Sequence, residues 1–445
     1  MSAMLAESRP DAATAVTEAP RRERKRVVII GGGFAGIAAA HALRHADAEV
    51  VLIDRRNHHI FQPLLYQVAT AVLSPAEIAA PIRQLEAKQR NASVLLAEVT
   101  AIDVASRTIE VEAASPGIGA RKIAFDYLVV ATGMHPNYFG HDEYARYAPG
   151  LKSLGDAETI RAKILGAFEL AAMTEDEGER ARQMTFVLVG AGATGVELAG
   201  SLAGLVKVTL RGNFRRIDPS KSTIILLDAG NRVLPTFAEA LSRRVTRHLT
   251  KLGVKVLTGV KVETVDEQGV VAGGKRIPSA TVLWTAGVAA SPVPKMLGSK
   301  TDRAGRALVD PFLKVVDAPG VFVVGDAASV MQNGHPVPGV AQAAIQQGRY
   351  VGRLIAKELK GRKVERPFSY FDKGNMAVVG MNYAVLERGW LRTSGFLTWL
   401  VWAFVHILSL PQLQNRLRVQ HQWLWSYFTG QRSSRLIPET HEPGH

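Results

Sequence analysis

Two glycine-rich segments are the residues whose spacing points most clearly to chemistry. Each begins with an apolar run, VVII in the first and FVLV in the second, and continues as G-x-G-x-x-G. In such a loop the first glycine permits a tight turn, the second lets the backbone approach a pyrophosphate, and the third allows close packing of helix on strand. The helix N-terminus then faces the phosphate charge. Two copies predict two bound dinucleotides, FAD and NADH or NADPH. The glycines are Gly31, Gly33 and Gly36 in the first loop and Gly190, Gly192 and Gly195 in the second.

An acidic residue follows each loop at the end of the next predicted strand. Asp54 lies 18 residues beyond Gly36, where a carboxylate can accept hydrogen bonds from the ribose hydroxyls of FAD. Asp228 in IILLDAG is its counterpart, and it favours NADH because a carboxylate would repel the 2′-phosphate of NADPH. Arg232 and the long spacing from Gly195 make this second assignment weaker than that of Asp54.

The elements that must hold these loops read as parallel strands and crossover helices. We expect a strand over Val27 to Ile30, a helix over Gly36 to Arg44 and a second strand over Glu49 to Asp54. Later strands end in similar turns, Ala131-Thr132-Gly133 and Thr285-Ala286-Gly287, so the same plan occurs twice. A further strand, Val321 to Val324, ends in Gly325-Asp326. Asp326 either binds the flavin ribityl or pyrophosphate region or caps a following helix.

Composition narrows the classes of protein. The chain has 445 residues, 47% of them hydrophobic, a net charge of +14 and an isoelectric point near 9.9. It has no cysteine, which excludes disulfide exchange and thiolate metal sites. We predict no metal, since His, Asp and Glu show no tight ligand spacing. The N-terminal residues lack the apolar core of a secretory signal and are predicted to be a disordered tail. The positive charge favours anionic partners.

The C-terminal part contains FLTWLVWAFVHILSL, residues Phe396 to Leu410. This run is shorter than the roughly 20 apolar residues that a spanning helix needs. In the next stretch Leu413, Leu417, Leu424 and Phe428 fall on one helical face, with basic residues and aromatics beside it. Such a pattern is typical of an interfacial helix on anionic lipid. A buried helix pair or a dimer interface is the alternative.

Three longer motifs are more specific than the glycine loops. They are HHIFQPLLYQVAT (His58 to Thr70), AQAAIQQG (Ala341 to Gly348) and YFDKGNMAVVG (Tyr370 to Gly380). With both loops they make the chain resemble the type II NADH dehydrogenases, single-subunit FAD enzymes with the glutathione-reductase plan, from about Val27 to Phe428. Where related disulfide reductases carry a redox-active cysteine pair, this chain has FQPLLYQ.

The resemblance implies roles for four residues. Gln342 and Gln346, at i and i+4 on one helix, would bind a quinone carbonyl, although the spacing alone fits an exposed polar face equally well. Lys373 would lie near the flavin, where a cation stabilises the anionic reduced ring, or it is a surface lysine. Glu197 would lie near nicotinamide and flavin and handle a proton, or it merely stabilises its helix N-terminus.

The remaining expected site residues bind cofactor. For FAD and NADH together they are Gly31, Gly33, Phe34, Gly36, Asp54, Gln62, Pro63, Leu64, Val99, Thr132, Gly133, Gly190, Gly192, Thr194, Gly195, Asp228, Gly287, Gly325, Asp326 and Ala343.

The expected fold is α/β, with two Rossmann-type domains and a C-terminal amphipathic helical region that attaches to a membrane. We predict a tail at 1–26, an FAD domain from 27–155 and 288–364, an inserted NADH domain at 156–287, and the attachment region at 365–445.

The expected reaction is hydride transfer from NADH to FAD, followed by two-electron reduction of a membrane quinone, menaquinone or ubiquinone, without proton pumping. The expected partners are an anionic lipid surface and a second copy of the chain, at the cytoplasmic face of a bacterial plasma membrane. One alternative is a soluble reductase that passes electrons to a protein such as a ferredoxin. Another is a flavin-containing nucleic-acid-binding protein, which the scattered basic residues argue against.

Overall fold

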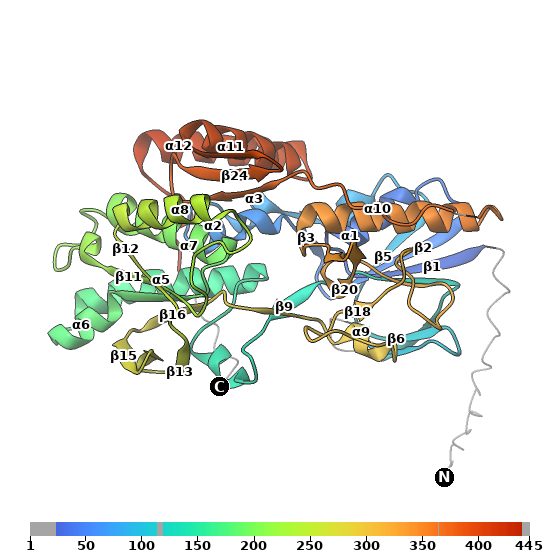
Figure 1. Ribbon diagram of the computed structural model, residues 1–445, viewed down its shortest axis with the longest axis horizontal. Coiled ribbons are helices and arrows are strands. Elements are labelled where there is room, and N and C mark those ends of the chain that lie inside the picture. Colours follow the sequence, from blue (N-terminus) through green and yellow to red (C-terminus); the bar gives the residue numbers. More distant parts are fainter. Residues whose placement is uncertain (1–23, 114–118, 364, 438–445) are drawn as a thin grey trace, which may run out of the picture.

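The computed structural model describes residues 24–113, 119–363 and 365–437. Residues 1–23 of the predicted tail and residues 438–445 of the predicted attachment region lie outside this part of the chain. Two α/β domains lie side by side, and a C-terminal layer covers them on one side (Figure 1). The predicted α/β class with two Rossmann-type domains is confirmed.

The first domain is built on a seven-stranded sheet in the order β19-β8-β1-β2-β5-β6-β7. Strands β19, β8, β1, β2 and β5 are parallel, and β6 and β7 extend the sheet in antiparallel fashion. Because β19 follows the second domain in the chain, the first domain consists of two separated segments, as predicted. The bounds are β1 Lys25–Ile30, β2 Ala48–Asp54, β5 Ala92–Asp103, β6 Thr108–Ala113, β7 Arg121–Ala124, β8 Tyr127–Val130 and β19 Val321–Val323.

Two helices cross closely over this sheet. Helix α1 (Phe34–Ala42) begins two residues before the predicted helix, because Gly33 is extended and acts as its N-cap. Helix α10 (Ala341–Glu358) packs against it beside β1 and β2 (Figure 1). A Cβ atom at Gly348 would lie 2.0 Å from the Ala35 carbonyl oxygen. Glycine at this position therefore sets how closely the two helices approach.

The second domain has a four-stranded parallel sheet in the order β12-β11-β10-β16. Its bounds are β10 Thr185–Val189, β11 Thr223–Asp228, β12 Val254–Thr258 and β16 Thr281–Trp284, with helices α5 Leu154–Met173, α6 Glu177–Gln183, α7 Ala193–Gly204 and α8 Glu239–Lys251. A π-helix, Leu205–Thr209, continues α7. Strands β9 (Met134–Pro136) and β17 (Val288–Ala290) pair antiparallel where the chain passes between the domains.

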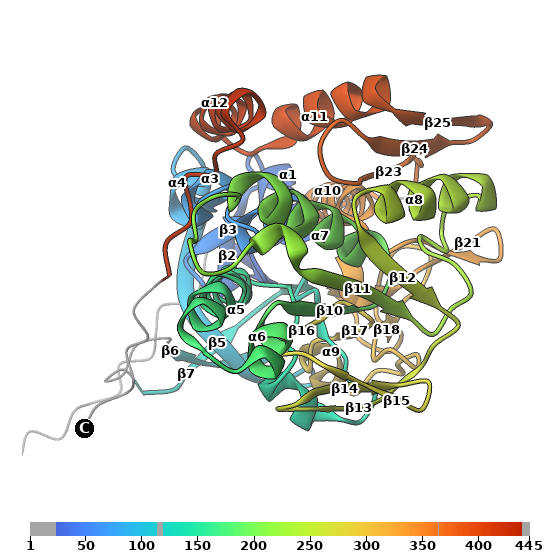
Figure 2. The same cartoon turned by 90° about the vertical axis from the view of Figure 1, so that its left-hand side faces the viewer.

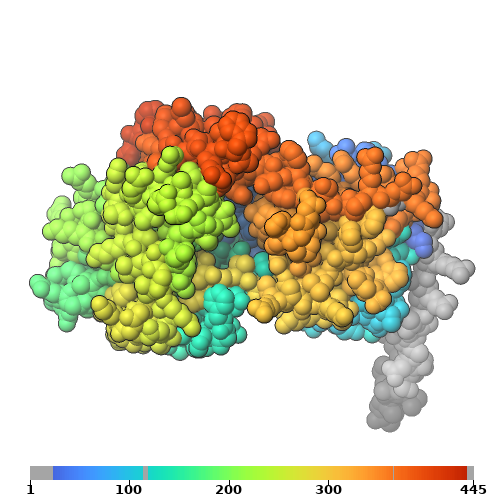
Figure 3. All heavy atoms as spheres, in the orientation of Figure 1, coloured from blue at the N-terminus to red at the C-terminus, as the bar shows by residue number. Residues whose placement is uncertain are grey.

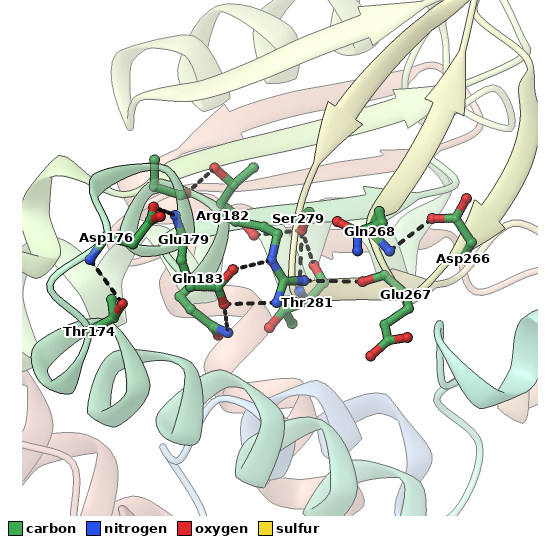
Figure 4. A network of polar contacts seen from close by, with 12 residues as sticks. Thr174, Asp176, Glu179, Arg182, Gln183, Asp266, Glu267, Gln268, Ser279 and Thr281 are labelled. Atoms are coloured by element: carbon green, nitrogen blue, oxygen red, sulfur yellow. Dashed lines mark hydrogen bonds and ion pairs between the residues drawn. The ribbon is translucent and has the colours of Figure 1, made fainter.

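A polar network anchors α6 to the three-stranded antiparallel sheet of β13 (Val262–Asp266), β14 (Gly269–Ala272) and β15 (Lys275–Pro278). Arg182 makes a bidentate ion pair with Glu179, at 2.7 and 2.8 Å, and also donates to the Glu267 carbonyl (Figure 4). The Asp176 side chain caps α6 by accepting from the Glu179 amide. These contacts stabilise the second domain at the edge opposite its glycine loop.

The C-terminal layer consists of an antiparallel sheet and two helices. The strands are β23 Asn375–Val378, β24 Ala384–Arg388 and β25 Leu391–Gly395, and the helices are α11 Phe396–Ser409 and α12 Leu413–Thr429. Both helices lie at the top of the molecule in Figures 1 and 2. Asn415 in α12 donates to three backbone carbonyls, those of Ala76, Glu77 and Ala79, which ties this layer to the first domain.

The outer face of this layer is apolar. The four residues predicted to share one face of α12 are 52 to 79% exposed: Leu413, Leu417, Leu424 and Phe428. The alternative of a buried helix pair is therefore wrong for this face. Exposed apolar residues of α11 continue the surface: Phe396, Leu397, Leu400, Val401, Phe404, Val405 and Leu408. Figure 3 shows the C-terminal segment, coloured orange-red to red, as one layer above the second domain. Within the described residues, no helix has both the length and the apolar character required to cross a bilayer.

Candidate functional site

The first glycine loop has the geometry of a pyrophosphate cradle. Gly31 has φ +105°, and a Cβ at Gly36 would lie 1.8 Å from the Gly31 carbonyl oxygen. Gly33 is exposed at the N-terminus of α1, and a Cβ there would meet no atom within 4 Å, so a ligand can reach the backbone. Asp54 accepts from the Gly32 amide at 2.6 Å and from the Arg56 amide at 2.7 Å. Its remaining lone pairs are free to receive ribose hydroxyls.

The second loop repeats this geometry. Gly190 has φ +106°, and a Cβ at Gly195 would lie 1.9 Å from the Gly190 carbonyl oxygen. Asp228 accepts from the amides of Ala191 and Gly230, at 2.5 and 2.6 Å. The long spacing before Asp228 is taken up by the π-helix and the loop after it, so this carboxylate reaches the same place as Asp54. Thr194 is exposed at the start of α7.

Other expected flavin residues surround the first loop. Phe34 packs edge-on against His59 and Phe61, with ring centroids 5.0 and 5.9 Å apart. His59 is buried and donates from Nδ1 to the Gly32 carbonyl; burial lowers its pKa, so the ring is neutral. The short 3₁₀ helix Gln62–Leu64 carries Gln62, Pro63 and Leu64, and Val99 is buried in β5.

The turns at the strand ends meet the same region. The hydroxyl of Ser291 donates to that of Thr132 at 2.6 Å, next to Gly133 with its φ of +67°. In the second domain Thr285, two residues before Gly287, donates to the carbonyls of Val189 and Gly190. The turn after β16 therefore braces the second glycine loop, and the turn after β8 lies against the first, where a Cβ at Gly31 would lie 2.4 Å from the Ala131 carbonyl oxygen.

Asp326 lies in a 3₁₀ turn, Gly325–Ala327, that leads into a strand, so its alternative role as an α-helix cap is wrong. Gly325 donates its amide to the buried Gln347 side chain at 2.6 Å, and Ala343 is buried on the same helix. Burial raises the pKa of Asp326, and the charge of Lys152 opposes that rise. Lys152 was not predicted; its backbone carbonyl accepts from Gln62, so the segments of Gln62 and Asp326 are neighbours.

Glutamine side chains hold the segment around Lys373. Gln342 donates to the Gly374 carbonyl and accepts from the Lys373 amide, at 3.0 and 3.1 Å. Gln346 contacts the carbonyl and amide of Phe371 in the same way, at 3.0 and 2.9 Å. Sequence spacing predicted that the two amides converge, but not that they hold this loop. Gln332 forms a third such pair with Tyr370, at 3.2 and 2.7 Å.

Glu197 lies in the first turns of α7, partly buried, and its carboxylate accepts from the Val378 amide at 3.4 Å. Burial raises its pKa from 4.5 to about 8, so the carboxyl is protonated at neutral pH. A group that holds a proton near neutrality can serve as an acid or base in a reaction. Strand β23 connects the loop that Gln342 holds with the amide that Glu197 contacts, because the strand begins one residue after Gly374 and ends at Val378.

Within the described residues, no group of three or more His, Asp or Glu side chains could hold a metal ion. The open backbone at Gly33, the exposed Thr194 at the second loop, and the strand-end carboxylates of Asp54 and Asp228 fit one FAD and one NADH. Two buried residues were not singled out from the sequence: Tyr66, and Arg432, which donates to the carbonyls of Thr70 and Ser201 at 2.7 and 2.9 Å. Tyr66 lies inside the specific motif His58 to Thr70, whereas no pattern distinguishes Arg432 from the other arginines near the C-terminus.

The profile of the pyridine nucleotide-disulphide oxidoreductase family matches residues 25–348. A type II NADH:quinone oxidoreductase of Mycobacterium tuberculosis is 44% identical over 431 residues, which cover 94% of this chain and 91% of that protein. A mitochondrial internal alternative NAD(P)H-ubiquinone oxidoreductase of Arabidopsis thaliana is 26% identical, covering 93% and 86%. Among solved structures, NDH2 from Plasmodium falciparum in complex with NADH has a TM-score of 0.83 at 21% identity, covering 92% of this chain and 99% of that one.

Proposed function

Because the chain belongs to the type II NADH:quinone oxidoreductases, we propose that it reduces its quinone beside Gln342 and Gln346 of α10 while α11 and α12 rest on a lipid surface. The enzyme passes electrons from NADH through FAD to quinone. Bound flavin supplies the redox chemistry, since it can take up a hydride and release two electrons. The residues of the chain bind and orient the flavin and its substrates and handle protons beside them.

The glycine loops assign the two nucleotides. The loop before α1 holds FAD, with Asp54 on its ribose, Asp326 toward its ribityl chain, and Gln62, Pro63 and Leu64 near its ring. The loop before α7 holds NADH, with Asp228 on its ribose. The observation that supports this order is burial at the two matching positions after the second glycine of each loop: Phe34 is half-buried and Ala35 is buried beneath α10, whereas Ala193 and Thr194 are exposed. An exchanging substrate needs the open loop.

The quinone site follows from the held loop. After contacting the 371–374 backbone, each amide of Gln342 and Gln346 retains one N–H and one lone pair. These can bind a quinone carbonyl, and Lys373, exposed between them, can stabilise negative charge on the reduced ring. Strand β23 begins one residue after Gly374 and spans about 10 Å, at roughly 3.3 Å per residue, and Glu197 contacts its far end at the Val378 amide.

A matched set of variants tests this site. Gln342→Met and Gln346→Met remove both a loop contact and a quinone contact, whereas Gln332→Met removes only the equivalent loop contact at Tyr370. We expect the first two to raise KM for a short-chain quinone about tenfold, the worth of a lost hydrogen bond, while NADH still bleaches the flavin. An equal effect in Gln332→Met would mean that the glutamines only hold the loop.

The apolar face of α11 and α12 is the proposed lipid contact. A continuous apolar surface rimmed by polar residues marks an interaction site. Here Trp390, 91% exposed, and Phe428, 79% exposed, lie among exposed basic residues, Arg388, Arg392 and Arg418. Apolar and aromatic side chains enter the interface of a bilayer, and basic ones attract anionic lipid. With NADH reaching the other side, this fits attachment to the cytoplasmic face of a bacterial plasma membrane.

Vesicle flotation tests the lipid contact. We expect the purified enzyme to float with phosphatidylglycerol vesicles and less with phosphatidylcholine, and Leu424→Gln to weaken flotation several-fold. Leu170→Gln on α5 is the control, because Leu170 is equally exposed, 53% against 52%, but lies outside the face. If Leu424→Gln instead dissociates a dimer of the detergent-solubilised enzyme and leaves flotation unchanged, the face is the interface of the predicted homodimer.

The soluble alternative, with a ferredoxin-like acceptor, is not supported. The relatives are named as quinone oxidoreductases, and the exposed apolar face would have no function in a soluble reductase.

A further inference from the structure

A cavity of about 700 Å³ lies where the chain leaves α12, between α5, the loop after the π-helix and the segment that follows α12. Sites for small molecules have volumes of about 300–1,000 Å³. The walls carry large apolar side chains, among them Phe168 of α5, Phe214 of the loop and Trp425 of α12. None of the described lining residues belongs to the glycine loops or to α10. The cavity is therefore separate from the proposed FAD, NADH and quinone sites.

Arg432 brings a buried positive charge to this cavity. It lines the cavity and is 7% exposed. Its guanidinium donates to the carbonyls of Thr70 and Ser201, one in each α/β domain, at 2.7 and 2.9 Å. Both acceptors are neutral, and among the described residues no carboxylate acts on the guanidinium. A buried cation without a counter-ion is costly. Since a guanidinium has five N–H groups, donors remain for an anion from outside the chain.

The other charges around the cavity also favour an anion. Arg435 is half-buried, lines the cavity, and donates from Nε to the Arg432 carbonyl at 3.1 Å, which is again a neutral acceptor. Arg211 and Arg215 are exposed on the loop that forms one wall. Glu169 is the acidic residue of the lining, and it is exposed to solvent. A ligand that carries a negative group therefore fits this cavity better than a neutral or cationic one.

The apolar wall of the cavity continues into the proposed lipid contact. Trp425, 53% exposed, follows Leu424 of that face directly, and Phe428 lies one turn further along α12. Thr209 Oγ1 donates to the Gly430 carbonyl at 3.0 Å, which holds the π-helix and its loop against the end of α12. In Figure 2 the segment after α12 runs down from the C-terminal layer. The cavity thus borders the surface that we assign to lipid.

We propose that this cavity binds one anionic phospholipid, with the headgroup phosphate on Arg432 and Arg435 and an acyl chain along Phe168, Phe214 and Trp425. The proposal rests on the proposed lipid contact and names the lipid which that contact recognises. A phosphate accepts from several N–H groups of a guanidinium at once, and an acyl chain is stabilised by apolar walls. A free phosphate would compensate the charge but leave the walls bare. A hydrocarbon chain alone would leave the charge unpaired.

A water-soluble lipid tests this site apart from the membrane surface. The probe is a phosphatidylglycerol with short acyl chains, added as a monomer to the delipidated, FAD-loaded enzyme and followed by isothermal titration calorimetry. We expect saturable binding of one lipid per chain. Inorganic phosphate tests the headgroup charge alone, and a neutral diacylglycerol with the same chains tests the apolar walls alone. We expect each of these to bind at least about tenfold more weakly, because each makes only part of the contacts.

Three variants locate the bound lipid. Arg432→Gln removes the buried charge, and we expect the Kd for the soluble lipid to rise about 10- to 100-fold, the worth of a charge-assisted hydrogen bond. Leu436→Glu places a carboxylate at the exposed edge of the cavity and keeps Arg432; we expect a rise of about tenfold from the repulsion of like charges. Met173→Glu is the matched control, because Met173 is 74% exposed against 75% for Leu436 but lies outside the cavity. If Arg432→Gln loses its fold, Leu436→Glu still decides.

The outcomes separate the site from the lipid-facing surface. If the unsubstituted enzyme does not float with vesicles, the proposed lipid contact fails. If it floats, but the soluble lipid does not bind or binds Leu436→Glu as well as Met173→Glu, the site in the cavity is overturned. Equal affinity for inorganic phosphate would mean that the cavity holds a free anion, and equal affinity for the diacylglycerol would mean that only its apolar walls matter. Either result contradicts the proposal.

Discussion

The two glycine loops share one backbone but have different surroundings. In both, the first glycine has φ near +105°, the third glycine lies under its carbonyl, and the strand-end aspartate accepts the amide of the residue between the first two glycines. Aligning the loops places Ala38 of α1 opposite Glu197 of α7. One position thus carries a methyl group in one domain and a titratable carboxyl in the other.

The neighbours of the two helices differ as well. Helix α1 is crossed by α10, with Gly348 and Gly352 bringing the backbones together. Helix α7 contacts α2 (Leu65–Ala69) and the C-terminal layer, where a Cβ at Gly200 would lie 2.5 Å from the Gly380 amide nitrogen. The repeated loop therefore accounts for the shared nucleotide-binding geometry, and the differing neighbours carry the proposal that FAD stays in the first loop while NADH exchanges at the second.

The largest effect is expected from the third glycines. Gly36→Ala puts a Cβ 1.8 Å from a carbonyl oxygen, so the loop must open; we expect loss of FAD on purification and a lower melting temperature. Gly195→Ala is the matched change in the second loop, and should keep FAD while raising the Kd for NADH more than tenfold. Flavin absorbance and NADH titration measure both. Loss of FAD in Gly195→Ala alone would reverse the assignment of the loops.

The strand-end acids should have the next largest effect. Asp228→Ala removes a charged acceptor of ribose hydroxyls, a loss of roughly 1.5–3 kcal/mol, which is about 10- to 100-fold in NADH affinity. Asp54→Ala should leave NADH affinity unchanged and instead speed FAD dissociation. Titration of NADH with each variant, reloaded with FAD, separates the two. Equal losses of NADH affinity would contradict the separate roles.

The raised pKa of Glu197 predicts a smaller difference between α1 and α7, which concerns how the stability of the fold depends on pH. Its pKa is raised from 4.5 to about 8, so between these values the folded protein holds a proton that the unfolded chain has released. Stability therefore falls as pH rises through this window, by at most about 1.4 kcal/mol per pH unit, and levels off above it. Glu197→Ala, which copies Ala38, should flatten this decline in thermal melts from pH 5 to 8. An unchanged slope would mean that the carboxyl titrates as in water.

The smallest effect is expected at the polar network of α6. Its Arg182–Glu179 ion pair is half-exposed, and Arg182 lowers the pKa of Glu179. The pair stabilises the fold above the usual pKa of a glutamate, and this contribution is lost as pH falls below it. Arg182→Gln should cost about 0.5–1 kcal/mol at pH 7 and leave NADH affinity unchanged. A change in NADH affinity would contradict this expectation, because it would mean that the second glycine loop depends on the polar network of α6.

The sequence predicted the parts that depend on local rules. The loops, the strands Tyr127–Val130 and Thr281–Trp284, and the exposed face of α12 follow from glycine geometry and hydrophobic period, and all lie where expected. Asp228 shows the limit of spacing rules. Its unusual distance from Gly195 argued against a role like that of Asp54, yet it accepts the Ala191 amide as Asp54 accepts the Gly32 amide, because insertions in a loop do not move a strand end.

Contacts between distant segments were beyond sequence reasoning. Arg432 reaches Thr70 and Ser201, and Trp423 reaches Gln67, across more than 200 residues. The loop contacts of Gln342 and Gln346 were missed for the same reason, since helical spacing defines a face but not what covers it. Which side chains meet across elements depends on tertiary packing.

Rapid mixing tests the central claim most directly: the holoenzyme is mixed with one equivalent of NADH, then with one equivalent of short-chain quinone, while flavin absorbance is followed. We expect NADH to bleach the flavin and the quinone to restore the full absorbance in a single fast phase, one quinone for each NADH. The account would be contradicted if oxygen or a protein acceptor restored the flavin absorbance after NADH had bleached it, while quinone did not.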